Sequence, residues 1–482
     1  MLRTGARSGP LAAVLLCCLW LVSGCASLPD TGFLSRQLPG DAGGHESGTE
    51  PIKRHPTRKA RFESARGPLS DQRSAAILAE LKRKSGDIDI LDRQILLEQE
   101  IVGSPLVVGN KVTLLQDGPE TYKAMFAAIA AAKDHVNIES YIVEDGEVGQ
   151  RFADLLLERQ ANGIQVNLIF DSVGAFATDK AYFERLRQAG VNVLEFNPVN
   201  PLAVRKPWTL NHRDHRKLLV VDGRVAFLGG INISNVYSTG SFVRGKVRPE
   251  MVAAGWRDTD IQIDGPVVGD FQKLFMRTWE SQKGDQLAAK NYFPTLAPRG
   301  KDIVRAIGST PDDPYSLIYL TLIAAITHAE KQVSITNAYF VPDPQLLKAL
   351  LDAAARGVDV RLILPGASDS ATVFHAGRSY YDELLAGGVR IYERHGAVLH
   401  AKTASVDGVW SVVGSSNLDW RSALDNDEIN AVILGRDFAR QMQAVFSQDI
   451  GAAEEIKLES WRRRSFLLRL KEQAARLWGR LL

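Results

Sequence analysis

The feature that most constrains this chain is a polar pattern that occurs twice inside strand-like runs. HRKLLVVD begins at His215 and HAKTASVD begins at His400, and each places a lysine two residues and an aspartate seven residues after the histidine. Because side chains alternate between the two faces of a strand, the histidine and lysine of each copy point the same way. One such pair would be an ordinary solvated strand face, whereas two copies in matching surroundings predict a shared function.

The surrounding sequence is duplicated as well. The strand-like runs HVNIESYIVED (135–145) and QVSITNAYFVPD (332–343) correspond, and each precedes an amphipathic stretch that ends in glycine, a common helix stop. Short apolar runs follow, IQVNLIFD (164–171) and VDVRLILPG (358–366). Strands that alternate with helices predict two α/β halves with mostly parallel central strands. Two such halves packed together would place equivalent residues on opposite sides of one cleft.

Small and neutral polar residues follow each copy of the pattern. FLGGINIS (227–234) and VVGSSNLD (412–419) each place an asparagine after residues that allow close backbone approach. Two lysines and two amides that converge on a cleft would bind a tetrahedral oxyanion, most simply a phosphate diester. The predicted phosphate-binding residues are Lys217, Asn232, Lys402 and Asn417.

The two histidines can then divide the chemistry. One would attack phosphorus, and the other would protonate the leaving alcohol. Neutral imidazole suits the first role and imidazolium the second, so we expect the pKa values of His215 and His400 to be pushed apart. Asp222 and Asp407 complete the two catalytic patterns, but each precedes a glycine in a hairpin signal, and a turn or positioning role is an equal alternative.

A metal site is the competing use of histidine. His212 and His215 are close in sequence, but His212 has no counterpart in the second copy. A lysine beside each patterned histidine would also repel a cation. We therefore predict no metal and no other cofactor.

With these residues in view, the chain resembles the phospholipase D superfamily, whose members carry two such HKD motifs, and within it the bacterial cardiolipin synthases. The resemblance covers about 105–482 and includes WRDTDIQIDGP (256–266) and LDWRSALDNDEIN (418–430). It implies an α/β fold of two duplicated phospholipase D-like domains with central mixed or parallel sheets and the active site at their interface. It also implies a phosphohistidine intermediate, with His215 as the nucleophile and His400 as the acid.

The resemblance further implies that an acidic residue orients each histidine. Glu428 fits this role for His400, and Asp258 is the matching candidate for His215. For Asp258 the alternative is an ordinary surface carboxylate at the end of a strand.

The first residues indicate export. Two arginines precede an apolar run (11–22) that is too short to cross a membrane comfortably and is typical of a secretory signal. The run leads into LVSGCAS, which resembles a bacterial lipobox and implies cleavage before Cys25 and lipid attachment to its thiol; an ordinary signal peptide with an incidental cysteine is the alternative. The other two cysteines lie within the run, so the mature chain would keep one. We expect an exported protein anchored through Cys25, on the periplasmic face of the outer membrane.

The two ends of the mature chain differ in character. The stretch from 28 to about 73 is polar and rich in Gly, Pro, Ser and Arg, so we expect a flexible tether. The segment 461–482 carries basic residues and leucines at helical spacing, so it either lies on anionic lipid or caps the second domain. The expected segments are a lipoprotein signal peptide (1–24), a tether and N-terminal helical segment (25–104), a first phospholipase D-like domain (105–295), a second one (296–460) and a basic amphipathic C-terminal helix (461–482).

We therefore predict a membrane-tethered phosphatidyltransferase of the cardiolipin synthase type, which acts on glycerophospholipids through a phosphohistidine. A phospholipase D that passes the same group to water has the same motifs. A phosphodiesterase acting on nucleic acid is disfavoured by a net charge of only +2, and a non-catalytic lipid-binding scaffold by intact motifs in both halves. The expected partners are a phospholipid substrate and a membrane surface, with no nucleic acid.

Overall fold

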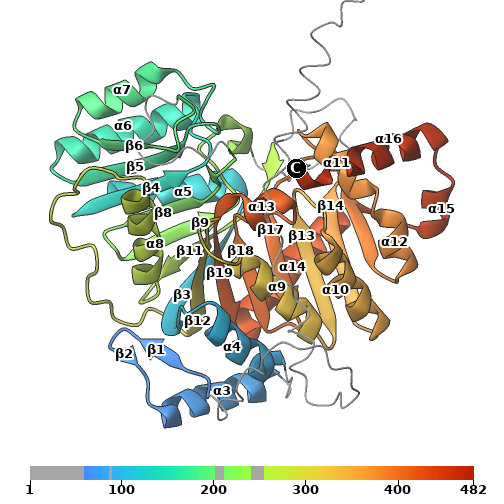
Figure 1. Cartoon of the computed structure of the whole chain (residues 1–482). Helices are drawn as coiled ribbons and strands as arrows, with labels where there is room; N and C mark the ends of the chain where they lie inside the picture. The colour runs from blue at the N-terminus through green and yellow to red at the C-terminus, as the bar shows by residue number, and fades with distance from the viewer. Residues whose placement is uncertain (1–58, 86–89, 201–210, 240–254, 482) are drawn as a thin grey trace, which may run out of the picture.

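The computed structural model describes residues 59–85, 90–200, 211–239 and 255–481 (Figure 1). The expected signal peptide, Cys25 and the tether as far as residue 58 lie outside the described residues.

The first repeat builds a mixed sheet. Its parallel part is made by β4, β5 and β6, and β8, β9, β11 and β3 continue it in antiparallel pairing. In spatial order the strands are β6 (Asn192–Phe196), β5 (Gln165–Asp171), β4 (His135–Ser140), β8 (Lys217–Val221), β9 (Val225–Gly229), β11 (Thr259–Asp264) and β3 (Leu106–Gln116).

The second repeat builds the corresponding sheet. β13, β14 and β15 run parallel, while the other strands pair antiparallel. In spatial order they are β12 (Asp302–Ser309), β19 (Asn426–Leu434), β18 (Trp410–Gly414), β17 (Lys402–Val406), β13 (Gln332–Asn337), β14 (Asp359–Pro365), β15 (Arg390–Arg394) and β20 (Ala453–Ile456). β3 pairs with β12, so the two sheets are continuous.

The expected duplication and the mixed sheet are confirmed, but the expectation of mostly parallel central strands is wrong for the strands that carry the motifs. β8 and β17 are each followed by a tight turn, and a chain that reverses in a tight turn returns as an antiparallel neighbour. In the two sheets, the successive strands joined through helices, β4 to β6 and β13 to β15, are parallel.

Helices cover the faces of both sheets (Figure 1). Those of the first repeat are α5 (Asp117–Ala130), α6 (Glu147–Ala161), α7 (Lys180–Gln188) and α8 (Val268–Ser281). Those of the second are α9 (Leu317–His328), α10 (Pro344–Ala355), α11 (Ala371–Arg378), α12 (Tyr381–Ala386), α13 (Trp420–Leu424), α14 (Arg436–Gly451), α15 (Leu458–Arg462) and α16 (Phe466–Arg476).

An apolar core joins the two repeats. Leu218 and Val220 of β8 belong to the same buried cluster as Ile429 and Ala431 of β19. Because faces alternate along a strand, the intervening Leu219 belongs to the separate cluster packed under α5 and α6. The two halves therefore share a packed interface and are fixed relative to one another.

Short strands also cross between the repeats. β7 (Arg213–Asp214) lies parallel to the start of β19. β10 (Trp256–Arg257) lies parallel to β16 (Val398–Leu399). Each crossing strand lies directly beside a motif histidine, so these two pairings determine the geometry of the site.

The end of the expected tether is ordered, which corrects its boundary. β1 (Phe62–Ser64) pairs with β3 and with β2 (Gly67–Pro68), and Phe62 is fully buried. The helices that follow are α3 (Asp71–Ser85) and α4 (Ile90–Ile101). Glu98 of α4 accepts a hydrogen bond from Trp410 Nε1 at 2.8 Å and pairs with Arg305 at 3.1 Å. The aromatic side chain and the buried ion pair attach this segment to the second repeat.

Over the residues that the structure describes, no helix is both long enough and apolar enough to cross a membrane.

Candidate active site

The crossing strands fix the backbone of both motif histidines. His215 N donates to Asp427 O at 2.9 Å, next to the pairing of β7 with β19. His400 N donates to Arg257 O at 2.7 Å, next to the pairing of β10 with β16. Each histidine is thus held in place by a strand of the other repeat.

The side chains are paired across the repeats in the same way. His215 Nδ1 lies 3.0 Å from Glu428 Oε1, and His400 Nδ1 lies 2.7 Å from Asp258 Oδ2. Both orienting residues are therefore correctly predicted, but the assignment of Glu428 to His400 and Asp258 to His215 is wrong. The reason is the crossing of the short strands. Glu428 lies near the start of β19, which pairs with β7 beside His215, and Asp258 directly follows β10, which pairs with β16 beside His400. A bonded Nδ1 leaves Nε2 as the ring nitrogen available for chemistry.

The two carboxylates are fully buried yet favour the ionised form. Burial by itself would raise the pKa of Asp258, but His400 and Lys402 lower it below its usual range. Glu428 behaves in the same way beside His215 and Lys217. Each histidine therefore faces an anion that can stabilise its protonated form.

The two motif lysines form a buried cationic pair. Lys217 Nζ donates to His215 O and Lys402 Nζ donates to His400 O, both at 2.5 Å. Burial lowers the pKa of Lys217 to about 7 and that of Lys402 to about 8, and Lys402 further lowers the pKa of Lys217. Two ammonium groups close enough to destabilise each other make a site for an anion such as a phosphate diester.

The histidine pKa values are not pushed apart as expected. Burial, followed by the adjacent lysine, lowers the pKa of both His215 and His400 to about 4, against the opposing effect of the carboxylates. The cause is that the duplication gives each ring the same two kinds of charged neighbour, a carboxylate and a lysine. An anion bound between them would raise both pKa values.

Aromatic side chains that the sequence analysis missed line the site. The Tyr141 ring lies 5.1 Å from His215, and the Tyr339 ring lies 6.1 Å from His400. Lys217 Nζ lies 5.2 Å from the Tyr141 ring centre, and Lys402 Nζ lies 5.9 Å from the Tyr339 ring centre. The available signal was a tyrosine just beyond each duplicated strand, in HVNIESYIVED and QVSITNAYFVPD.

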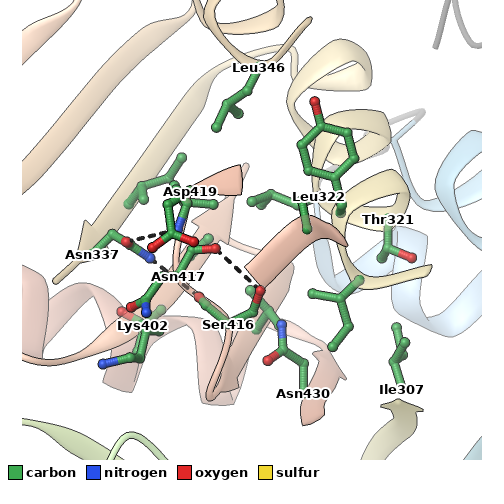
Figure 2. Close-up of a pocket in the computed structure, with 18 of the residues that line it drawn as sticks. Ile307, Thr321, Leu322, Asn337, Leu346, Lys402, Ser416, Asn417, Asp419 and Asn430 are labelled. Atoms are coloured by element: carbon green, nitrogen blue, oxygen red, sulfur yellow. Dashed lines mark hydrogen bonds between the residues drawn. The ribbon is translucent and has the colours of Figure 1, made fainter. Parts of the chain in front are cut away.

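The two predicted asparagines have different surroundings. Asn232 accepts from Ile142 N at 3.1 Å and donates to Tyr237 Oη at 3.2 Å, and that oxygen lies 3.1 Å from His400 Nδ1. Asn232 therefore positions Tyr237 beside His400. Asn417 lies beside Lys402 in a cavity of the second repeat (Figure 2).

The catalytic assignment of Asp222 and Asp407 is replaced by a structural role. Asp222 accepts hydrogen bonds from the backbone amides of three consecutive residues, 133–135, and Asp407 from those of 330–332. Their φ angles are 53° and 52°, and each is followed by a glycine that also has positive φ, as a tight hairpin requires. At about 3.3 Å per residue, each carboxylate lies roughly 20 Å along the chain from its histidine.

His212, the remaining candidate metal ligand, lies 2.8 Å from Asp427 through its Nε2 atom. In the described ranges, no group of three or more His, Cys, Asp and Glu side chains is arranged to hold a metal ion.

Comparison with known proteins identifies the family. The family model described as "Cardiolipin synthase, PLD-like domain" matches residues 125–240 and 322–450, one segment in each repeat. The chain belongs to this family. It is an enzyme of the phospholipase D superfamily.

Relatives in this family are similar over most of their length. The chain is 34% identical to a cardiolipin synthase of Halalkalibacterium halodurans over 405 residues, which are 84% of this chain and 78% of that protein. It is 36% identical to a cardiolipin synthase of Geobacillus kaustophilus, with 78% of this chain and 74% of that protein covered. It is 35% identical to cardiolipin synthase 2 of Bacillus anthracis, with 76% and 70% covered.

A solved structure supports the fold. The phosphatidylserine synthase of Haemophilus influenzae superposes with a TM-score of 0.59 at 14% identity, over 80% of this chain and 98% of that one. At this identity the similarity concerns the architecture of the two repeats.

Proposed function

We propose that this chain transfers a phosphatidyl group from one glycerophospholipid to the alcohol of another through a phosphohistidine. The observation that carries the proposal is the crossed pair of histidine–carboxylate contacts beside two buried lysines. Two oriented imidazoles supply a nucleophile and a proton carrier, and the lysines neutralise the phosphate between them.

The reaction has two displacements at phosphorus. In the first, His215 Nε2 attacks the phosphorus atom, the bond from phosphorus to the leaving alcohol oxygen breaks, and that oxygen takes the proton of His400. In the second, the acceptor hydroxyl gives its proton to His400, its oxygen attacks phosphorus, and the N–P bond breaks. Each histidine returns to its starting state.

Two features favour His400 as the proton carrier. Its contact with Asp258 is the shorter of the two, at 2.7 Å against 3.0 Å for His215 and Glu428. A shorter charge-assisted contact better stabilises an imidazolium. The hydroxyl of Tyr237 also contacts His400.

Product analysis with phosphatidylglycerol vesicles tests the proposal. We expect cardiolipin and glycerol as products, and a histidine-bound label, stable to alkali and labile to acid, after alkaline quenching of protein incubated with phosphatidylglycerol labelled at phosphorus. Phosphatidic acid as the sole product would replace the transferase with a hydrolase. Lipid binding without turnover would leave a scaffold. Adding phosphatidylethanolamine tests whether a second lipid alters the product.

We also propose that α16 contacts the membrane surface. The helix packs against the second repeat through a polar residue, because Glu472 is buried and accepts hydrogen bonds from Arg464 at 2.6 Å and Arg378 at 3.3 Å. Its large apolar side chains point outward, and the exposed ones in and after the helix are Phe466, Leu467, Leu468, Leu470, Leu477 and Trp478. This arrangement is the reverse of an ordinary surface helix and disfavours the alternative that the apolar face caps the domain.

Charge and position agree with such a contact. Arg469 and Lys471 are exposed beside the apolar residues, whereas the acidic residue of the helix is buried. Arg480 lies 5.5 Å from the ring centre of Trp420, in the helix that follows the Asn417 loop. Figure 1 shows α16 and α13 at the same end of the molecule. A basic apolar surface next to the site would hold the enzyme on anionic lipid.

Vesicle flotation tests this contact. Leu467→Asn combined with Leu470→Asn should reduce binding to phosphatidylglycerol vesicles several-fold. Phe293→Asn, which changes an exposed aromatic residue of the first repeat, is the matched control and should bind like wild type. Equal binding by both variants would exclude α16 as the contact.

We further propose that the protein is exported and lipid-anchored through Cys25, on the basis of LVSGCAS. Cys25→Ser should move the protein from the membrane fraction to the soluble fraction, and unchanged fractionation would exclude this anchor. Separation of inner and outer membranes would test placement on the periplasmic face of the outer membrane.

A further inference from the structure

The second repeat contains a cavity that reaches the motif residues. It lies between α9 and the sheet, encloses about 640 Å³ including its mouth, and has Lys402 and Asn417 among its lining residues. Figure 2 shows both side chains grouped with Asn337 and Asp419, while Leu322 and Thr321 lie across the cavity. The residues assigned above to phosphate binding therefore also form part of the cavity wall.

Buried polar atoms in this wall have no partner. Thr321 Oγ1, Asn417 Oδ1 and Asn430 Oδ1 are buried and make no hydrogen bond to any residue in the described part of the chain. The exposed fractions of these residues are 3%, 7% and 8%. The rest of the lining combines aliphatic side chains, Ile307, Ile335 and Val432 among them, with the carboxylates Asp343 and Asp419. Unpartnered buried acceptors are uncommon and indicate a site for a molecule that donates hydrogen bonds.

The first repeat has packed the corresponding space. Its counterpart, which includes Lys217 and Asn232, encloses about 320 Å³ and is lined by Tyr122 and Phe152. Tyr122 Oη donates to Asn232 O at 2.6 Å and so closes over the asparagine loop. The hydroxyl of Tyr319, the equivalent tyrosine of the duplication, donates instead to Asp343, 2.5 Å away. The larger cavity is thus particular to the second repeat.

We propose that this cavity is the subsite that selects the acceptor alcohol, and that it binds the hydroxyl groups of a neutral, glycerol-sized polyol through Thr321, Asn430 and Asn417. The proposal rests on the proposed transfer reaction. The polyol places one hydroxyl at the phosphate beside Lys402 and its other hydroxyl groups in the cavity. Its position in the second repeat puts the acceptor on the side of His400, which takes the acceptor's proton.

The lining favours this ligand over two others. An acyl chain would cover the three polar atoms with hydrocarbon and leave them without partners. An ammonium headgroup would lie next to the Lys402 cation, and the two carboxylates of the lining already accept hydrogen bonds, Asp343 from Tyr319 and Asp419 from the backbone amide of Ser422. Hydroxyl groups satisfy the acceptors and carry no charge.

A competition between acceptors tests the proposal. The full-length protein is given phosphatidylglycerol vesicles with added radiolabelled glycerol, 1-propanol or ethanolamine. Label that enters lipid measures capture by each alcohol, including glycerol, whose product is phosphatidylglycerol itself, and phosphatidic acid measures transfer to water. Thr321→Val removes the hydroxyl at constant volume, Thr321→Ser retains it, and Asn430→Leu removes the amide. Thr327→Val, the same substitution further along α9 and outside the cavity, is the matched control.

We expect wild type to prefer glycerol to 1-propanol. Thr321→Val and Asn430→Leu should each reduce capture by glycerol roughly three- to tenfold relative to water, as the loss of one hydrogen bond implies. Capture by 1-propanol, which has no further hydroxyl group to place in the cavity, should not change. Thr321→Ser and Thr327→Val should behave like wild type.

Three results would overturn the subsite. Unchanged partitioning in both Thr321→Val and Asn430→Leu would mean that the cavity holds only water. A lower KM for phosphatidylglycerol in Thr321→Val, with a new dependence on acyl-chain length, would mean that it holds a chain. A preference for ethanolamine would mean that it holds a cation. If wild type transfers to no acceptor, the proposed transfer fails and the subsite fails with it; in the other three cases the transfer remains intact.

Discussion

The two repeats share one fold and one set of motif residues, but they differ in the residues that surround the two buried carboxylates of the site. In the first repeat Gly230 leaves room for the short Asp258, whose Oδ1 would lie 2.2 Å from a Cβ at that glycine. At the corresponding place in the second repeat, Ser415 donates a hydrogen bond to the longer Glu428. The duplication therefore supplies two similar imidazoles, and small differences around them allow two different roles.

The largest expected effect separates the two histidines. Replacing His215 by Ala should abolish both turnover and the histidine-bound label. Replacing His400 by Ala should slow turnover by roughly 10³-fold or more but still allow label to accumulate when the leaving alcohol is a good one, since an activated alcohol needs no proton. Rapid-quench experiments with a phosphatidyl nitrophenol donor would measure this. Label in the His215→Ala variant and none in His400→Ala would exchange the two roles.

The crossed carboxylates give the next effect. Glu428→Gln and Asp258→Asn should each lower kcat by roughly 10²–10⁴-fold, because each amide loses the charge that orients its imidazole. Glu428→Gln should slow formation of the label, whereas Asp258→Asn should mainly slow protonation of the leaving alcohol. Comparing nitrophenol and glycerol leaving groups measures the difference. If Glu428→Gln and Asp258→Asn have the opposite pattern, the crossing does not govern the chemistry.

The lysines predict a pH dependence with a defined sign. Each binds phosphate only as an ammonium ion, and their pKa values are lowered from 10.5 to about 7 for Lys217 and about 8 for Lys402. We therefore expect kcat/KM to fall as the pH rises through this range. Bound phosphate favours the ammonium form, so kcat should fall at higher pH. A pH profile that stays flat to pH 10 would contradict this assignment.

The smallest effect concerns the hairpin aspartates. Asp222→Ala and Asp407→Ala should each lower the free energy of unfolding by about 1–3 kcal/mol, because backbone amides lose their acceptor. The two variants should lose similar stability, since both turns have the same geometry. Thermal unfolding measures this, and kcat measured well below the melting temperature should be nearly unchanged. A large loss of kcat with normal stability would restore a catalytic role.

The sequence was informative where local pattern and duplication were enough. The motif residues, the mixed sheet and the identity of both orienting carboxylates follow from spacing and resemblance. The pairing of carboxylate to histidine did not, because it depends on β7 and β10, which are too short to show a periodic pattern. The sequence contains the two site tyrosines at matching positions, but it does not show that they lie beside the motif histidines and lysines in space.

The cavity of the second repeat could not be predicted from the sequence. It depends on the direction in which Tyr319 points and on Leu346 standing opposite, where Phe152 fills the first repeat. In the sequence, the helices and strands around this position are equally apolar in the two repeats. A difference of packing volume between two buried faces becomes visible only when the side chains are placed.

Each imidazole contacts a carboxylate of the opposite half. The site is therefore complete only when the two halves are correctly packed against each other. A half produced alone would carry its motif histidine without the carboxylate that contacts it. If the halves packed a few ångströms out of register, both histidine–carboxylate contacts would be lost together, so such a chain would be inactive rather than partly active. The complete site therefore forms only after both halves have folded and docked.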